Sequence, residues 1–166
     1  RDYDLVYWDH ALHHMMDVDA AVKWSVERLS PGGCLVINDY VGPTRLQWKK
    51  RDVDAANVCL NEAAEAVGKD PINVSYRTVI HRLRMMVRDP SEAPESDKIL
   101  DACKKHCHGW APDRIGCAMI NVCGPSIMRL SRNDSVAQDV LIAHDKAYDA
   151  TSGSHFAFGV YQKPGA

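Results

Sequence analysis

Polar side chains with the potential for chemistry follow two short apolar runs of this sequence. After the first run come Trp8, Asp9 and His10, and after the second come Asn38, Asp39 and Tyr40. In open α/β sheets, ligands bind beyond the carboxyl ends of the strands, and adjacent strands lie about 4.8 Å apart. Both groups should therefore share one rim. Two further histidines, His13 and His14, read equally well as solvated loop residues, and Asp39 could instead cap the next segment.

The elements expected to position this rim are a strand, a helix and a second strand. The first strand is predicted at Asp2–Tyr7. Asp17 suits a helix N-cap, and apolar residues then recur at helical spacing until Ser30-Pro31-Gly32-Gly33 ends the helix. Cys34–Ile37 is a continuous apolar run, typical of a strand buried on both faces. The sequence thus predicts a βαβ unit with a right-handed crossover.

The remainder of the chain is mostly helical in pattern. Apolar stripes predict four helices, which begin near Val53, Val79, Ser96 and Val136 and end at Gly68, before Asp89, at Gly109 and near Ala147. Strand-like runs are expected at Cys117–Val122 and at the closing Phe156–Tyr161. Ser126–Leu130 is too short to assign. We expect one domain, because 166 residues are enough for a single core.

Composition and charge narrow the class of protein. With 46% hydrophobic and 25% charged residues, the chain matches ordinary globular domains rather than disordered or collagen-like ones. No apolar run approaches the roughly 18 residues of a membrane span and no leader-like start is present, so we expect a cytoplasmic protein without a membrane partner. The net charge of -2 argues against a nucleic-acid partner. The basic stretch Arg45–Arg51 does not change this expectation, because the helix that follows is acidic from Asp52 onward.

Six cysteines raise the question of disulfides or a metal site. Two of them fall within apolar patterns, where a free cysteine behaves as a small hydrophobic residue. Cys103 and Cys107 are four apart and could share a helix face. The next two, Cys117 and Cys123, are too loosely spaced to be the second pair of a structural zinc site. We therefore expect reduced thiols and no bound metal.

Seven short sequence motifs occur in a particular order along the chain. Four lie near the start: Y-D-L-V (3–6), A-L-H-H (11–14), L-S-P-G-G (29–33) and L-V-I-N-D-Y (35–40). Three reach further: D-Y-V-G-P-T-R-L-Q-W (39–48), D-P-S-E-A (89–93) and H-F-A-F-G-V-Y-Q-K (155–163). In this order they resemble the second half of a class I S-adenosylmethionine-dependent methyltransferase, of a bacterial branch in which a helical insertion after the fifth strand covers the substrate pocket.

The resemblance implies an α/β fold with a partial Rossmann-like sheet. The sheet would have about four strands, mostly parallel with an antiparallel last strand, and a helical insertion would accompany it. Within the single domain 1–166, residues 1–42 would form the βαβ core, 43–112 the helical lid insertion, and 113–166 the closing strands and helix.

The resemblance also implies roles for individual residues. Asp9, His10 and Asp39 would be catalytic; Trp8, Asp9 and His14 would bind the cofactor S-adenosylmethionine; and Asn38, Tyr40, Arg45 and Trp48 would bind a small-molecule methyl acceptor. A base such as Asp39 or His10 would take the proton of the acceptor while the sulfonium methyl group is held in line with it.

The chain departs from the family in lacking its donor-binding half. No Gly-rich word of the G-x-G-x-G type occurs, and the ten glycines are scattered at turns. The sequence corresponds to the family's fourth strand onward, and in the family's strand order, 3-2-1-4-5-7-6, the missing strands are contiguous. The remaining four strands could form a slab whose first strand has an unpaired edge. We therefore expect a homodimer through that edge.

Three functional hypotheses follow. The first is a truncated methyltransferase relative that is not catalytic alone and binds S-adenosylmethionine only if the missing N-terminal half is supplied. The second is a small-ligand-binding or assembly module that reuses the acceptor pocket and self-associates. The third is an enzyme completed by a donor-binding half on another chain.

Overall fold

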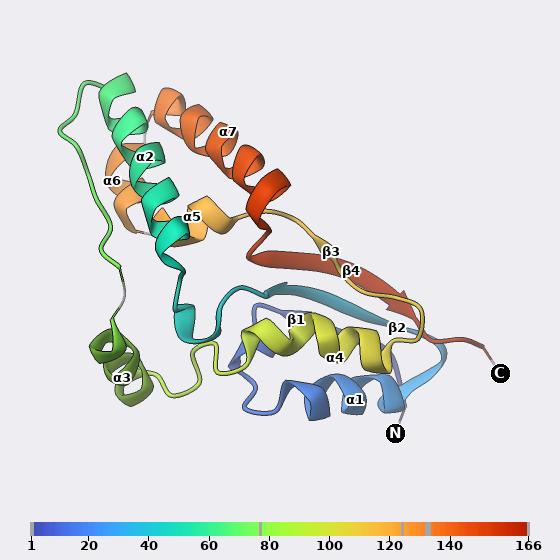
Figure 1. Cartoon of the computed structure of the whole chain (residues 1–166). Coiled ribbons are helices and arrows are strands. Elements are labelled where there is room, and N and C mark those ends of the chain that lie inside the picture. Colours follow the sequence, from blue (N-terminus) through green and yellow to red (C-terminus); the bar gives the residue numbers. More distant parts are fainter. Residues whose placement is uncertain (1, 77, 124, 132–133, 166) are drawn as a thin grey trace.

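The computed structural model describes residues 2–76, 78–123, 125–131 and 134–165, and it has an α/β fold. Its sheet contains the strands β1 (Tyr3–Asp9), β2 (Leu29–Tyr40), β3 (Asp113–Arg114) and β4 (Phe156–Gln162), in the order β1-β2-β4-β3. β1 and β2 are parallel, whereas β4 is antiparallel to both of its neighbours. The last strand therefore runs against the other three (Figure 1). The predicted α/β class and the four-stranded sheet with an antiparallel last strand are confirmed.

The predicted βαβ unit begins the fold. α1 (Val18–Arg28) starts after Asp17, whose carboxylate accepts a hydrogen bond from the Ala20 N–H at 2.8 Å. β2 starts earlier than predicted, directly after α1, because Ser30–Gly33 continues as extended chain beside the start of β1 with an irregular register. Glycine is needed at Gly33, since a Cβ there would lie 3.0 Å from the carbonyl oxygen of Tyr3.

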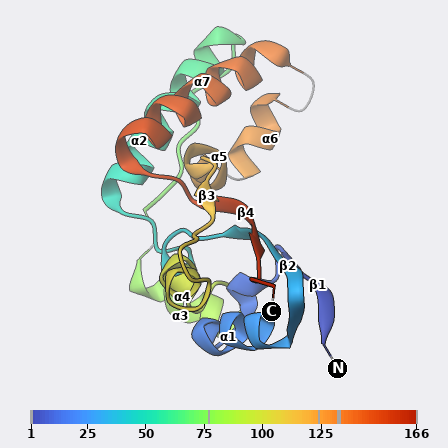
Figure 2. The ribbon, with the colours of Figure 1, turned by 90° about the vertical axis from the view of Figure 1, so that its right-hand side faces the viewer.

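One face of the sheet packs on α1 and on α4 (Ile99–His106). Leu35 and Ile37 of β2 are fully buried in a core that also contains Val22 of α1 and Ile99 of α4. Figure 2 shows both helices on the same side of the sheet. This layer of sheet and helices forms the first hydrophobic core.

The opposite face of the sheet carries exposed apolar side chains. Because side chains alternate along a strand, Leu5 and Tyr7 of β1 point away from the covered face, and they are 57% and 54% exposed. Tyr3 differs, because its ring lies 6.2 Å from that of Trp24 in α1. Phe158 and Val160 of β4 are 44% and 50% exposed. Leu5, Tyr7, Phe158 and Val160 thus remain 44–57% exposed, and Figure 2 shows α1 and α4 on the other side of the sheet. We call this surface the open sheet face.

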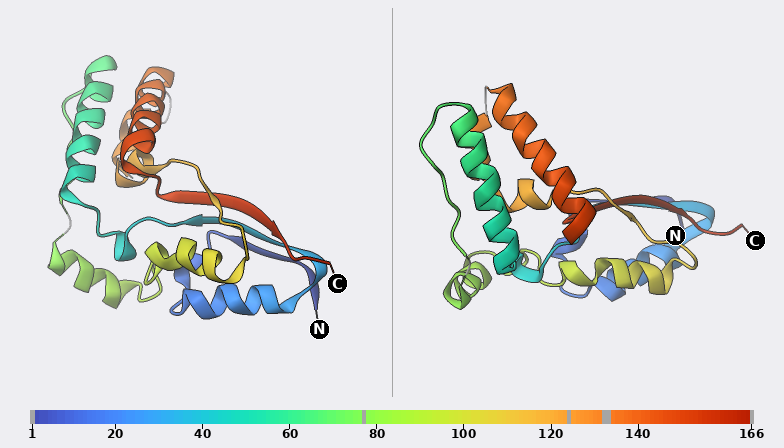
Figure 3. Two further views of the ribbon diagram at one scale, coloured as in Figure 1. Left: turned by 45° about the vertical axis from the view of Figure 1, so that its right-hand side comes forward. Right: turned by 45° about the horizontal axis from the view of Figure 1, so that its top comes forward.

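A second core lies beyond one end of the sheet, in a helical cluster. The cluster consists of α2 (Lys50–Ala66), α5 (Ala118–Cys123), α6 (Pro125–Ser131) and α7 (Ser135–Ser152), and Figure 3 shows it standing away from the sheet layer. The expected insertion, 43–112, is thus divided between the two cores. α2 packs with α5 and α7 of the closing part, whereas α4 packs beside α1 because its buried residues Ile99, Ala102 and Cys103 join the sheet core.

The strand predicted at Cys117–Val122 is wrong, because residues 118–122 lie in α5 and Cys117 directly precedes that helix. A short apolar run fits either a helix or a strand by its local pattern. The deciding contact is distant in sequence: Asp145 of α7 accepts hydrogen bonds from the N–H groups of Cys117 and Met119, both at 2.8 Å. It thereby satisfies two N–H groups that a helix start leaves unpaired. The unassigned residues 126–130 lie in α6.

α3 (Val79–Arg88) forms where the sequence predicts a helix, but none of its residues is buried. Its apolar stripe, which includes Val79, Leu83 and Val87, remains more than half exposed. Among the helices in the described ranges, none combines the length and the apolar character needed to cross a membrane.

Candidate functional site

Three of the predicted rim residues meet at the carboxyl ends of β1 and β2. Asp9 pairs with Asn38 in the parallel register, and the Asn38 side-chain amide donates a hydrogen bond to the Asp9 carboxylate at 2.8 Å. The N–H of His10 donates to the carbonyl of Asn38 at 2.9 Å. His10 has a φ of 49°, an uncommon conformation that turns the chain immediately after β1. Its ring then lies 5.4 Å from that of Phe156.

A cavity of about 440 Å³ opens beside this rim. Its lining consists of His10, Asn38, Ile115, Cys117, Ile120, Asn121 and Phe156. Most of these side chains are apolar, as in sites that take small molecules. The side-chain amide nitrogen of Asn121 is buried without a hydrogen-bond partner among the described residues, so it is available to a ligand's acceptor atom. We call this space the rim cavity.

Five of the residues that line the rim cavity were missed by the sequence reasoning. Ile115, Cys117, Ile120 and Asn121 come from the segment between β3 and the end of α5, where a strand was predicted. Phe156 was assigned only to the closing strand. The strand order of the resembled family could have indicated Phe156, because that order places the last strand beside the strand that carries Asn38. The cap from Asp145 that positions α5 has no local signal.

Asp39 does not face the rim cavity. It follows Asn38 in β2 and therefore points to the covered face, where it is fully buried. Its carboxylate accepts hydrogen bonds from the N–H groups of Ala11, Leu12 and Tyr40 at 2.7–3.0 Å. The fourth hydrogen bond of this carboxylate is with the ring Nδ1 of His13, which lies 2.5 Å from Asp39 Oδ1. This carboxylate thus fixes the turn after β1, and all four of its contacts are within the protein.

His13 is held by the same contact. It lies in the short 3₁₀ helix η1 (Leu12–His14) and is buried. Burial acts to lower the pKa of His13, but the hydrogen bond to Asp39 and the negative charges of Asp39 and Glu92 outweigh it. The pKa of His13 is therefore raised above its usual value.

The predicted donor-binding residues are dispersed. Trp8 faces α1, where its indole N–H donates to the Ser25 hydroxyl at 2.9 Å. His14 lies on the other side of the turn, with its Nδ1 3.0 Å from the carbonyl oxygen of Ser91. Only Asp9 of the three remains at the rim, on the same face as Asn38.

The predicted acceptor-binding residues are also divided. Asn38 lines the rim cavity, but Tyr40 is buried and donates its hydroxyl hydrogen to the carbonyl of Pro43 at 3.1 Å. Arg45 is buried in the 3₁₀ helix η2 (Thr44–Leu46), where its guanidinium binds backbone carbonyls. Trp48 belongs to the core of the helical cluster. These three residues support the walls of the site rather than line the rim cavity.

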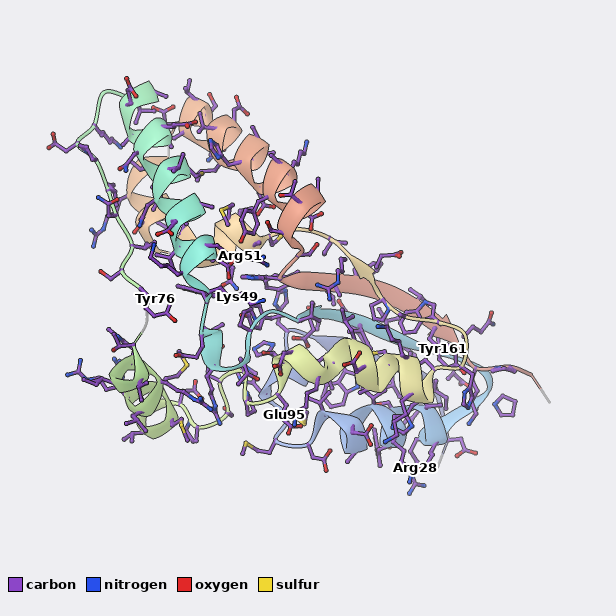
Figure 4. All side chains as sticks on the ribbon, viewed as in Figure 1. Arg28, Lys49, Arg51, Tyr76, Glu95 and Tyr161 are labelled. Atoms are coloured by element: carbon purple, nitrogen blue, oxygen red, sulfur yellow. The ribbon has the colours of Figure 1, made fainter. Side chains whose placement is uncertain are left out.

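A second cavity, of about 290 Å³, lies between the β2–α2 connection and the α7–β4 connection. Lys49 and Arg51 at the start of α2 line it, and Figure 4 shows them beside the junction with β4. Arg114 and His155 line it from the other side. The Nδ1 of His155 is buried and has no hydrogen-bond partner in the described ranges.

Burial lowers the pKa of His155, although the charges of Asp52 and Asp145 oppose this effect. A depressed folded-state pKa means that the unfolded chain binds more protons, so stability falls as the pH drops below about 6.5 toward the folded-state pKa. We expect His155→Phe to remove this part of the pH dependence, worth up to about 1.4 kcal/mol per pH unit. Urea unfolding at several pH values measures it. His108→Phe, at an exposed histidine, is the control and should leave the slope unchanged; an unchanged slope in His155→Phe would contradict the assignment.

The six cysteines are free. Two buried pairs share thiol hydrogen bonds, Cys103 with Cys107 and Cys59 with Cys123. In each pair the hydrogen bond raises the pKa of one thiol, that of Cys103 or Cys123, and lowers the pKa of its partner, Cys107 or Cys59. Buried thiols of raised pKa are poor nucleophiles and poor metal ligands.

The described residues do not form a complete site for S-adenosylmethionine. A donor-binding loop needs glycines at which the absent Cβ makes room for the ligand. The glycines that a Cβ would crowd here, Gly33, Gly42, Gly116 and Gly159, lie against Tyr3, Tyr40, Asp145 and Trp110 of the chain itself. The donor therefore does not fit these residues alone.

Neither a protein-family model nor a curated protein matches this chain.

Proposed function

We propose that this chain is the acceptor-binding half of a class I S-adenosylmethionine-dependent methyltransferase, and that it is not catalytic alone. The observation that carries the proposal is the strand order β1-β2-β4-β3 with β4 antiparallel. It corresponds to the order 4-5-7-6 at one end of the family's sheet, including the reversed seventh strand.

The rim cavity supports the same proposal. It lies at the carboxyl ends of β1 and β2, where ligands of open α/β sheets bind. Its mainly apolar lining suits a small-molecule acceptor, and Asn38 and Asn121 offer amide groups for orientation. Of the two proposed bases, His10 borders this cavity, whereas Asp39 is buried on the opposite face. His10 is therefore our candidate for the group that takes the acceptor's proton.

The open sheet face supports the need for a second polypeptide. Monomeric proteins seldom leave a contiguous apolar sheet surface exposed, and an edge strand with unpaired backbone groups invites pairing. β1 is the edge strand here and borders the open sheet face. We propose that a donor-binding half docks on this surface, and that two copies of the chain pair through β1 when that half is absent. Six free cysteines agree with a cytoplasmic location.

A small-ligand-binding or assembly module is the second candidate. The observation that favours it is the division of the predicted donor-binding residues, since Trp8 and His14 both face away from the rim cavity. Such a module would use the rim cavity for another ligand.

A nuclear magnetic resonance titration with S-adenosylhomocysteine tests the proposal. We expect weak, millimolar binding, with shifts confined to the amides of residues 8–10 and 38, and at least about a 10-fold loss in His10→Ala. His108→Ala, at an exposed histidine, is the matched control. Micromolar binding by the chain alone would show that it already holds the donor. The absence of shifts at the rim at any soluble concentration would favour the binding module.

A further inference from the structure

The turn after β1 and the loop that follows α3 bring three metal-ligating side chains together. His13 and His14 belong to η1, and Glu92 belongs to the loop before the 3₁₀ helix η3 (Ser96–Lys98). One ligand atom from each of the three lies within 4.8 Å of the others. The segments that carry them are 77 residues or more apart in sequence, so only the tertiary fold creates this group.

The hydrogen bonds of the two rings leave a suitable atom for a metal. The carbonyl of Ser91 is an acceptor, so the Nδ1 of His14 is the donor in their 3.0 Å contact. The Asp39 carboxylate accepts three backbone N–H bonds and the Nδ1–H of His13. The lone pair that can bind a metal is therefore on Nε2 in both rings. A histidine that binds zinc commonly donates its other ring nitrogen to a carboxylate or a backbone carbonyl, as both do here.

The loop that carries Glu92 is held in place by Arg45. The guanidinium of Arg45 donates to the carbonyls of Pro90 and Glu92 at 2.5 and 3.2 Å. The N–H of Arg45 donates to the carbonyl of Ala93 at 2.7 Å. Arg45 is buried, so these contacts fix the loop beside η1 before any ligand arrives. Ligands of a tetrahedral zinc stand about 3.3 Å apart, so ligand atoms within 4.8 Å of one another would need to approach by at most about 1.5 Å.

We propose that His13, His14 and Glu92 form a binding site for a zinc-class divalent metal ion. Two imidazoles and one carboxylate are a known ligand set for zinc that leaves a coordination position open. Glu92 also lines a cavity of about 590 Å³, into which that position can face. Arg84 and Arg88 line the same cavity and favour an anionic group as the further ligand. The site is independent of the proposed methyltransferase function, since none of its ligands borders the rim cavity.

Cobalt(II) titration of the full chain, with the thiols kept reduced, tests this proposal. We expect one equivalent to bind with visible bands of nitrogen and oxygen ligation and without a thiolate charge-transfer band. Glu92→Gln and His14→Ala should each weaken binding by at least about 10-fold. His81→Ala, which changes a histidine of the same cavity outside the ligand group, should not.

A second measurement guards against misfolded variants. Zinc should raise the thermal unfolding midpoint of the wild-type chain and of His81→Ala, but not that of Glu92→Gln, whose far-ultraviolet circular dichroism should match the wild type. His13 is left unchanged because it supports the buried Asp39. No binding, binding with a thiolate band, or equal binding by Glu92→Gln would each overturn the proposal.

Discussion

Asp39→Ala is expected to lower the free energy of unfolding by about 3–5 kcal/mol, the range measured when one partner of a buried charged pair is removed. Asp39 is fully buried and accepts hydrogen bonds from three backbone N–H groups and from His13. Alanine would leave all four groups without a partner, and water cannot easily replace the carboxylate there. Whole domains have only about 5–15 kcal/mol of stability, so this loss would remove a large part of it.

Urea unfolding followed by circular dichroism measures this loss. Asp9→Ala is the matched control, because Asp9 is exposed and its side-chain hydrogen bonds, with Asn38 and Tyr7, are not buried. Its cost should be within about 1 kcal/mol. Asp39→Asn should fall between the two, since it keeps the shape but replaces one acceptor oxygen with a donor. Equal unfolding midpoints for Asp39→Ala and Asp9→Ala would contradict the structural role.

In solution without another polypeptide, the chain is expected to associate into dimers, and Leu5→Lys is expected to separate them. Leu5 lies in the middle of β1, the edge strand, and is 57% exposed on the open sheet face. Pairing of β1 with its copy across a two-fold axis would bring the two lysines close together in a poorly solvated place. We expect the dissociation constant to rise on the order of 100-fold.

Size-exclusion chromatography with light scattering gives the mass directly. The wild-type chain should show about twice the 18.5 kDa mass of one copy, and Leu5→Lys should show one copy. Leu83→Lys places the same charge on the exposed apolar stripe of α3 and should remain dimeric. A clean monomer of the wild-type chain at high concentration would count against association through β1.

The βαβ unit could be predicted from local signals, because each of them acts on its own neighbours. The Asp17 cap, the helical spacing from Val18 and the apolar run Cys34–Ile37 all depend on residues close in sequence. α5 could not be predicted in this way. The carboxylate that accepts from the N–H groups at its start belongs to Asp145, in the distant α7.

The sequence predicted where the candidate site lies, at the carboxyl ends of two strands, but not which side chains line it. Asp9, His10 and Asn38 were expected at one rim and do meet there. Asp39 was expected beside them, but strand alternation points it to the covered face, as it must for the neighbour of Asn38. Arg45 and Trp48 were expected to line a pocket, and they are buried in the supporting structure instead.

By itself, the sequence determined the type and order of most elements, since caps, apolar periods and turn residues act over a few positions. Only the tertiary structure decided which distant segments meet. It divided the expected lid insertion between two cores, and it brought His13 and His14 beside Glu92. The physical reason is that burial of apolar surface selects the packing of whole helices, and that packing sets which polar groups meet.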